Sequence, residues 1–141
     1  MKRGAFNIIE LIFVIIILGI LASVVVVKMS SMTRNAKEAQ LKSFVGTLNR
    51  SVGPAIWFKS IENGREGSIA FADYDTDLGK YIEIIPNYAS APALVNCNES
   101  GDGIFVSYLF GKNYEVYCRD GNTTTSPRFR LYNQTDSIYM D

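Results

Sequence analysis

The chain has 141 residues, of which 14 are basic and 14 acidic, and it contains no histidine. A net charge of zero gives no sign of bulk nucleic-acid binding, and the missing histidine removes the commonest general base and metal ligand. The sequence also lacks a Gly-rich phosphate loop and a Cys-x-x-Cys pair, so we expect a protein that is not an enzyme. The length suffices for one domain and a membrane anchor.

The N-terminal region is dominated by an apolar run. From Phe6 to Val27 there are 22 residues with a single charge, Glu10. A helix of this length spans roughly 33 Å, about the thickness of the hydrocarbon core of a bilayer. A secretory signal peptide has a shorter core, of about 7–15 residues, followed by a small-residue cleavage site. The run therefore predicts a transmembrane helix over residues 6–28.

Glu10 is the exceptional residue of this helix. A carboxylate is costly in lipid, so its presence indicates a function or a charged partner. The alternative is that Glu10 lies at the depth of the lipid headgroups and stays solvated.

The segment Gly4-Ala5-Phe6-Asn7-Ile8-Ile9-Glu10-Leu11-Ile12-Phe13-Val14-Ile15 resembles the N-terminus of the type IV pilin and type II secretion pseudopilin superfamily. In that family a short basic leader precedes a small residue, then Phe, with Glu as the fifth residue of the mature chain. The run Leu18-Gly19-Ile20-Leu21-Ala22 is also similar. Ala5 stands where the family usually has Gly, and the resemblance covers about the first 28 residues.

This resemblance implies a leader of residues 1–5 and cleavage between Ala5 and Phe6 by a prepilin peptidase, which also N-methylates Phe6. It implies that the apolar helix first crosses the inner membrane once, with its N-terminus in the cytoplasm, and later bundles with copies of itself in a filament. Glu10 would then set the assembly register by neutralising the Phe6 amine of a neighbouring subunit. Such a pairing matters because a buried charge is tolerable only when it is paired.

The partners that the resemblance implies are copies of the chain itself, the prepilin peptidase, an inner-membrane assembly platform and minor pilins. The filament would be a cell-surface pilus or, as the alternative, a periplasmic pseudopilus of a type II secretion or DNA-uptake system. The sequence does not indicate whether nucleic acid is bound. An alternative from another class is a membrane-anchored binding or adhesin domain, which needs neither the cleavage nor Glu10.

The helix is expected to continue beyond Lys28, from about Phe6 to about Phe58. Apolar residues recur there at spacings of three and four, which places them on one helix face: Leu41, Phe44, Val45, Leu48, Val52 and Ile56. Gly53-Pro54 is the expected place for a kink or an end, because proline removes a hydrogen bond and clashes with the preceding turn.

The second half of the chain is expected to form short strands. Runs of aromatic and β-branched residues predict strands at 68–73, 81–85, 104–110, 114–118, 128–132 and 137–140. Gly111-Lys112-Asn113 is a candidate hairpin turn. We therefore expect an α+β pilin fold, in which a long N-terminal helix, apolar in its first half and amphipathic in its second, packs on a small antiparallel sheet. The globular domain would span residues 29–141.

Three aspartates, Asp73, Asp75 and Asp77, resemble the start of an EF-hand calcium loop. The positions that require Gly and Glu hold Leu78 and Ile84, so the full motif fails. The favoured interpretation is an acidic surface turn. A calcium site at the three aspartates is kept as the alternative, because some pseudopilins use calcium, and no other cofactor is expected.

Two cysteines, Cys97 and Cys118, lie late in the chain. The leader charges Lys2 and Arg3 and the family resemblance place them outside the inner membrane, where an oxidising compartment permits a disulfide. Such a bond would stabilise the fold by about 3 kcal/mol. Many type IV pilins have a similar late disulfide, whereas major pseudopilins usually lack it, which favours a pilin. The alternative is two free thiols.

Overall fold

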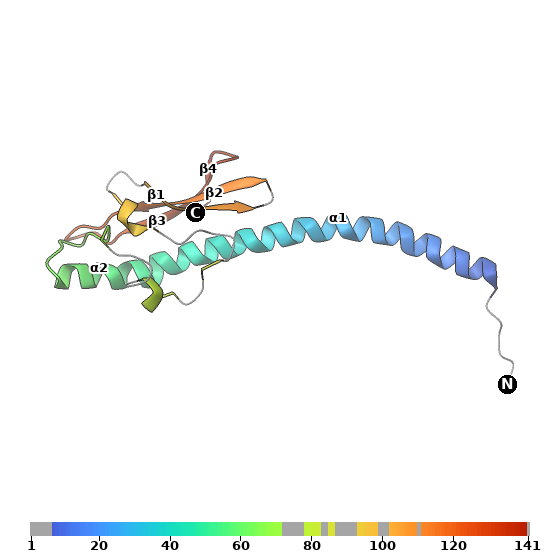
Figure 1. Ribbon diagram of the computed structural model, residues 1–141, viewed down its shortest axis with the longest axis horizontal. Coiled ribbons are helices and arrows are strands. Elements are labelled where there is room, and N and C mark those ends of the chain that lie inside the picture. Colours follow the sequence, from blue (N-terminus) through green and yellow to red (C-terminus); the bar gives the residue numbers. More distant parts are fainter. Residues whose placement is uncertain are drawn as a thin grey trace, which may run out of the picture. The chain divides into compact units, whose positions relative to one another are not determined.

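The computed structural model describes residues 7–71, 78–82, 85–86, 93–98 and 111–140, and the backbone of residues 102–109. The chain divides into two units, Met1–Ala36 and Lys37–Asp141. Helix α1, Ile8–Thr47, belongs to both units (Figure 1). The fold class is α+β, as the sequence predicts. The predicted domain boundaries after residues 5 and 28 stay predictions.

In the first unit, α1 begins directly after Asn7, whose carbonyl oxygen accepts the backbone N–H groups of Glu10 and Leu11 at 3.0 and 3.3 Å. The hydroxyl groups along the helix do not interrupt it. Those of Ser23 and Ser31 donate to the carbonyl oxygens three residues earlier, at 2.7 and 2.8 Å. Because each hydroxyl is satisfied inside its own helix, these polar residues are compatible with an apolar environment.

In the second unit, the helix passes through Gly53-Pro54 instead of ending there. A π-helical turn, η1 (Leu48–Val52), leads directly into α2 (Gly53–Glu62). The N–H of Gly53 donates to the carbonyl oxygen of Leu48, five residues back. This wider turn accommodates a proline that can donate no hydrogen bond, and π-turns are a known cause of local adjustment in helices. The helix also extends to Glu62, beyond its predicted end near Phe58.

The sheet has four antiparallel strands in the order β1-β2-β3-β4. Their bounds are β1 Asp102–Leu109, β2 Lys112–Arg119, β3 Arg128–Asn133 and β4 Ile138–Tyr139, so the last four predicted strands are confirmed. Leu109 pairs with Lys112, so Lys112 and Asn113 belong to β2 and not to the predicted turn at 111–113. Gly111 has a φ of 82°, a conformation that glycine adopts without strain.

The first two predicted strands are wrong for the residues that the structure describes. Ser68 and Ile69 lie outside any strand, and the second prediction falls just after a 3-10 turn, η2 (Leu78–Lys80). Around Ser68 the backbone finds side-chain partners instead of a neighbouring strand. The Ser60 hydroxyl donates to the Ser68 carbonyl oxygen at 2.6 Å, and the N–H of Ile69 donates to the Asp120 carboxylate at 2.7 Å.

The core of the second unit lies between the helix and the inner face of the sheet (Figure 1). The predicted helix stripe is confirmed, because all six of its apolar residues are buried. Along β2 and β3 every second residue is buried, which gives the sheet one inner and one outer face. The inner face contributes Tyr114, Val116, Cys118, Phe129 and Leu131. Burying such side chains stabilises a fold by about 1.5–3 kcal/mol each.

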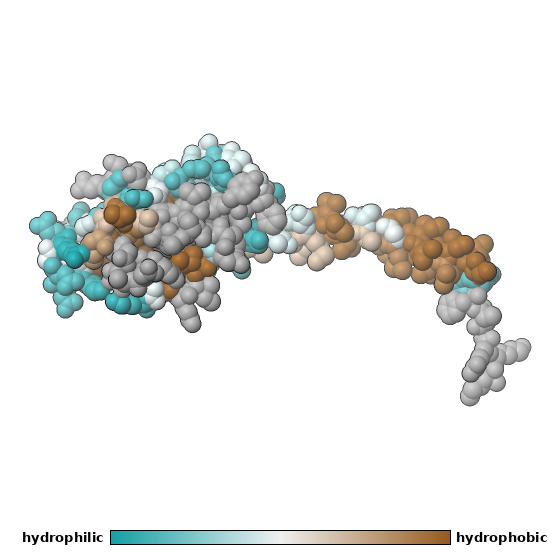
Figure 2. Space-filling model, viewed as in Figure 1, coloured by the Kyte–Doolittle hydropathy of each residue, from teal (hydrophilic) through white to brown (hydrophobic). Residues whose placement is uncertain are grey.

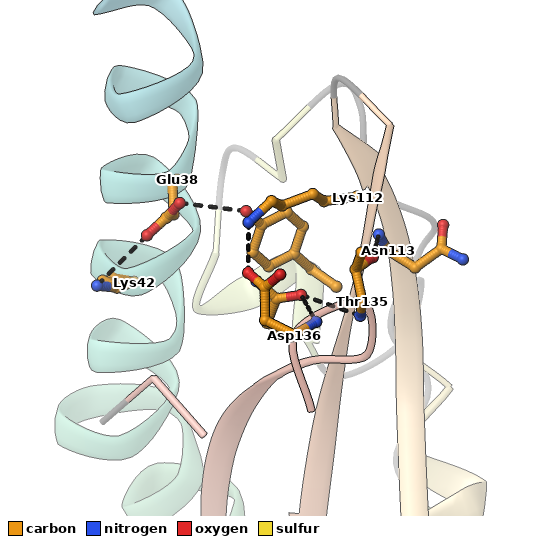
Figure 3. Close-up of polar contacts among 8 residues, drawn as sticks. Glu38, Lys42, Lys112, Asn113, Thr135 and Asp136 are labelled. Carbon is orange, nitrogen blue, oxygen red and sulfur yellow. Dashed lines mark hydrogen bonds and ion pairs between the residues drawn. The ribbon is translucent and has the colours of Figure 1, made fainter. Parts of the chain in front are cut away.

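Polar contacts join the helix to the sheet at the edge of this core (Figure 3). The Tyr114 hydroxyl of β2 donates to the Glu38 carboxylate of α1 at 3.1 Å. Glu38 also forms an ion pair with Lys42, one helical turn later, at 3.6 Å. Nearby, Lys112 at the start of β2 forms an ion pair with Asp136. The buried Tyr114 therefore keeps a partner for its one polar atom, as buried tyrosines require.

Candidate functional site

The most prominent surface of the first unit is the apolar part of α1. The large apolar side chains from Ile8 to Val27 are all exposed, between 41% for Ile17 and 77% for Ile8. Figure 2 shows this segment as a hydrophobic surface. The helix is long and apolar enough to cross a membrane. An exposed apolar surface of this extent marks a membrane or protein contact, because water is a poor solvent for it.

Glu10 lies in the first turn of α1. Its side chain is exposed, and no cation in the described part of the chain lies within ion-pair distance of its carboxylate. The positive end of the helix dipole favours a carboxylate at this position. The predicted partner, the amine of a mature Phe6, and the predicted cleavage site at Ala5 and Phe6 lie outside the described residues. The role of Glu10 in assembly stays a prediction.

Gly19 and Ser23 are two small residues, four positions apart, on the apolar helix. A Cβ added at Gly19 would meet no atom within 4 Å, so no contact inside the described chain requires a glycine there. Glycine costs a helix roughly 1 kcal/mol relative to alanine. Small residues let helix backbones approach closely in lipid or in a bundle. This part of α1 therefore suits contact with another helix.

The predicted disulfide between Cys97 and Cys118 is confirmed. Cys97 follows a 3-10 turn, η3 (Leu94–Asn96), and both cysteines are buried. Next to the bond, Asn98 forms a parallel bridge with Arg119, and its carbonyl oxygen accepts the N–H of Asp120 at 2.9 Å. The covalent link and these backbone contacts fasten the segment around Cys97 to the end of β2.

The three aspartates of the calcium hypothesis, Asp73, Asp75 and Asp77, lie outside the described residues. Among the residues that the structure does describe, no group of three or more acidic, cysteine or histidine side chains could hold a metal ion.

A basic groove in the second unit was not predicted. It has a volume of about 620 Å³ and lies between α1 and the region where β2 ends and β3 begins. Its lining includes Lys42 and Gly46 from the helix, and Arg119 and Arg128 from the strands. The two arginines are direct partners in the β2–β3 register. The predicted strands at 114–118 and 128–132 contained a signal for this pair, because Arg119 follows the first of them and Arg128 begins the second.

Three tyrosines gather on the outer face of the sheet. The ring centroids of Tyr117 and Tyr132 lie 5.6 Å apart, and those of Tyr132 and Tyr139 lie 4.9 Å apart. Partial burial raises the pKa of Tyr117 above its ordinary value of 10.0, and the negative charge of Glu115 raises that pKa further. The phenol of Tyr117 thus stays neutral over a wider pH range than that of a free tyrosine.

Comparisons with family models, with curated proteins and with solved structures found no match to this chain. The architecture itself, an apolar N-terminal helix followed by a small antiparallel sheet, is pilin-like. It brings together an apolar surface that needs a partner and a globular unit closed by a disulfide.

Proposed function

We propose that this protein is the structural subunit of a type IV pilus-like filament. In this proposal a prepilin peptidase cleaves the chain before Phe6 and methylates the new amine. The apolar half of α1 then leaves the inner membrane and bundles with its copies. The observation that carries the proposal is the exposed apolar surface from Ile8 to Val27 with one carboxylate, Glu10, near its start.

The apolar surface supports both stages of this life cycle. Moving each large side chain out of water is favourable by about 1.5–3 kcal/mol, whether the side chain enters lipid or packs against other helices. Transfer from lipid to a helix bundle is nearly neutral for these side chains, because lipid tails are as apolar as leucine. The choice between membrane and filament must therefore depend on polar groups and on close packing.

Glu10 is the polar group that distinguishes the membrane from the filament. A carboxylate within lipid costs about 2.5–3.5 kcal/mol on insertion scales, and an ion pair with an amine offsets this cost. Cleavage before Phe6 would create such an amine four residues from Glu10. The pairing of this amine with Glu10 of another subunit favours one axial offset between neighbouring helices. This ion pair therefore favours assembly in register for the processed chain and is missing in the unprocessed chain.

The disulfide favours a surface pilin over the pseudopilin alternative. A Cys97–Cys118 bond suits the oxidising conditions of both the periplasm and the cell surface, and it holds the segment around Cys97 against β2. A filament outside the cell meets shear and proteases, against which a covalent closure protects. The pseudopilin of a secretion or DNA-uptake system remains the second candidate with the same processing and helix chemistry.

The test is the intact mass of the chain in sheared surface material and in washed membranes. A mature chain that begins at methylated Phe6, lighter by two hydrogens for the disulfide, is expected in the sheared fraction. The same mass found only in the cell envelope would favour the pseudopilin. A chain that still begins at Met1, found in membranes alone, would contradict both and indicate a simple anchored domain.

A further inference from the structure

The basic groove has features of a binding site that filament assembly does not require. We propose that it binds a ligand with two adjacent oxyanion groups, phosphate or carboxylate, through Lys42, Arg119 and Arg128. All three residues belong to the second unit and line the groove. Its volume of about 620 Å³ is within the range of small-molecule sites, roughly 300–1,000 Å³.

The groove concentrates positive charge in a chain that is neutral as a whole. Its lining includes four cationic residues, Lys42, Arg119, Arg128 and Arg130, but one carboxylate, Asp120. Lys42 forms a partly exposed ion pair with Glu38, and the Arg130 guanidinium lies 4.0 Å from the centre of the Tyr139 ring. Arg119 and Arg128 are therefore the cations that define the site. The Asp120 oxygens already accept three hydrogen bonds, from the Ser68 hydroxyl at 2.6 Å and from two backbone N–H groups at 2.7 and 2.8 Å. The Asp120 carboxylate is therefore used mainly to hold the loop, and it neutralises the neighbouring arginines less.

Arg119 and Arg128 form the centre of the site. They stand directly opposite each other at the end of the β2–β3 ladder, and both are exposed. Like charges at such positions repel, since their Cβ atoms are only about 4.5–5.5 Å apart. No ion pair offsets this repulsion within the described residues. An oxyanion between the two guanidinium groups would convert the repulsion into attraction, with bidentate hydrogen bonds to phosphate or carboxylate.

The rim of the groove is held in place before any ligand arrives. The Asn122 side chain accepts the N–H groups of Thr124 and Thr125 at 2.9 and 2.8 Å, which closes a tight turn. The Asn122 carbonyl oxygen accepts the Trp57 indole N–H at 2.8 Å, so α2 holds this turn. A rigid rim lowers the entropy lost on binding, because fewer groups must be ordered by the ligand.

Gly46 leaves the helix side of the groove open. A Cβ added there would meet no atom within 4 Å, although the residue lies in the middle of α1. Lys42, one turn earlier, borders the same space. With no side chain at Gly46, a ligand between the two arginines has room to extend along the helix. It would then compete with Glu38 for the ammonium group of Lys42, whose ion pair with Glu38 is partly exposed. This placement favours a ligand with two oxyanion groups over one with a single group.

The proposal is tested by calorimetric titration of the full chain in zwitterionic detergent at low ionic strength. The probes are pyrophosphate, which has adjacent phosphate groups, and citrate, which has adjacent carboxylates. We expect one site per chain. Because each hydrogen bond to a charged group contributes about 1.5–3 kcal/mol, the double variant R119Q/R128Q should bind at least about tenfold more weakly.

Arg34→Gln is the matched control, because it removes an exposed cation that does not line the groove. Lys42→Gln is a second variant that leaves the sheet untouched and should also weaken binding. Tight binding of pyrophosphate alone would identify a phosphate ligand, and binding of both probes an oxyanion site without that preference. Equal binding by the wild type, R34Q and R119Q/R128Q, or no binding by the wild type, would overturn the proposal.

Discussion

The side chain of Asn49, on the π-helical turn, pairs with the backbone of Phe129 in β3 as a neighbouring strand would. Its amide nitrogen donates to the Phe129 carbonyl oxygen at 2.8 Å, and its amide oxygen accepts the Phe129 N–H at 2.9 Å. Further along the same edge, the Leu131 carbonyl oxygen accepts the N–H of Met140 at 2.8 Å. These three backbone groups of Phe129 and Leu131 would otherwise be unpaired, because β4 pairs only with the last two residues of β3.

Asn49→Ala should destabilise the globular unit by about 2–6 kcal/mol, because it leaves a donor and an acceptor of Phe129 without partners, at about 1–3 kcal/mol each. Asn49→Asp is the matched control, since it keeps the acceptor and the shape but loses the donor. We expect the order of stability wild type, then Asp, then Ala at neutral pH. Denaturant unfolding measures it, and equal stability of Asn49→Ala and the wild type would contradict this role of Asn49.

The two glycines of the helix, Gly46 and Gly53, should respond to alanine in opposite directions. A Cβ at Gly46 meets open space, so Gly46→Ala should stabilise the protein by about 0.5–1 kcal/mol through the lower entropy of the unfolded chain. A Cβ at Gly53 would lie 2.9 Å from the Leu48 carbonyl oxygen and 3.0 Å from the Phe129 ring. Gly53→Ala should therefore lower the melting temperature, and each variant is the control for the other.

The features that the sequence predicted correctly depend on local patterns. The stripe from Leu41 to Ile56 repeats at helical spacing, and such a period indicates a buried face whatever the sheet does. The strands around Tyr114 and Phe129 alternate in burial as their residue types predict. The pairing of Cys97 with Cys118 needed only the two cysteines and an oxidising compartment.

The features that were missed depend on residues far apart in the chain. Ser68 and Ile69 have the composition of a strand, but Asp120, about 50 positions away, provides their hydrogen bonds. The turn at Gly53-Pro54 stays helical because the π-turn and the packing of Phe129 override the local preference for a break. The basic groove arises only when β2 and β3 are in register, which no single stretch of sequence reveals.

Loss of the disulfide should weaken the globular unit without unfolding the apolar helix. The double variant C97S/C118S should lose about 3 kcal/mol, the loop-entropy estimate for a closure of this length. Urea unfolding with and without a reductant measures the effect. The wild type should shift to the stability of the double variant on reduction, whereas the variant itself should not respond. A wild type that is insensitive to reductant would show that the bond does not stabilise the fold.

Alkaline pH should destabilise the outer face of the sheet through Tyr117. Its pKa in the folded protein is raised above 10.0, so the neutral phenol is favoured by folding. The corresponding stability is fully present below the unfolded pKa and is lost as the pH rises through the folded pKa. Tyr117→Phe should reduce the fall in melting temperature between about pH 9 and pH 11. Tyr81→Phe, at an exposed position, is the control and should follow the wild type.

Glu10→Ala should leave cleavage before Phe6 intact while it prevents assembly. The mature amine of a neighbouring subunit would then be buried without a partner, and breaking such a pair costs about 3–5 kcal/mol. Glu10→Asp keeps the charge on a shorter side chain and should retain part of the assembly. Glu62→Ala, which removes an exposed carboxylate at the end of α2, is the matched control and should assemble normally. The amount of sheared filament per cell measures assembly, and the mass of the membrane-bound chain measures cleavage. Normal filaments from Glu10→Ala would mean that the register is set by close packing around Gly19 and Ser23 and not by charge.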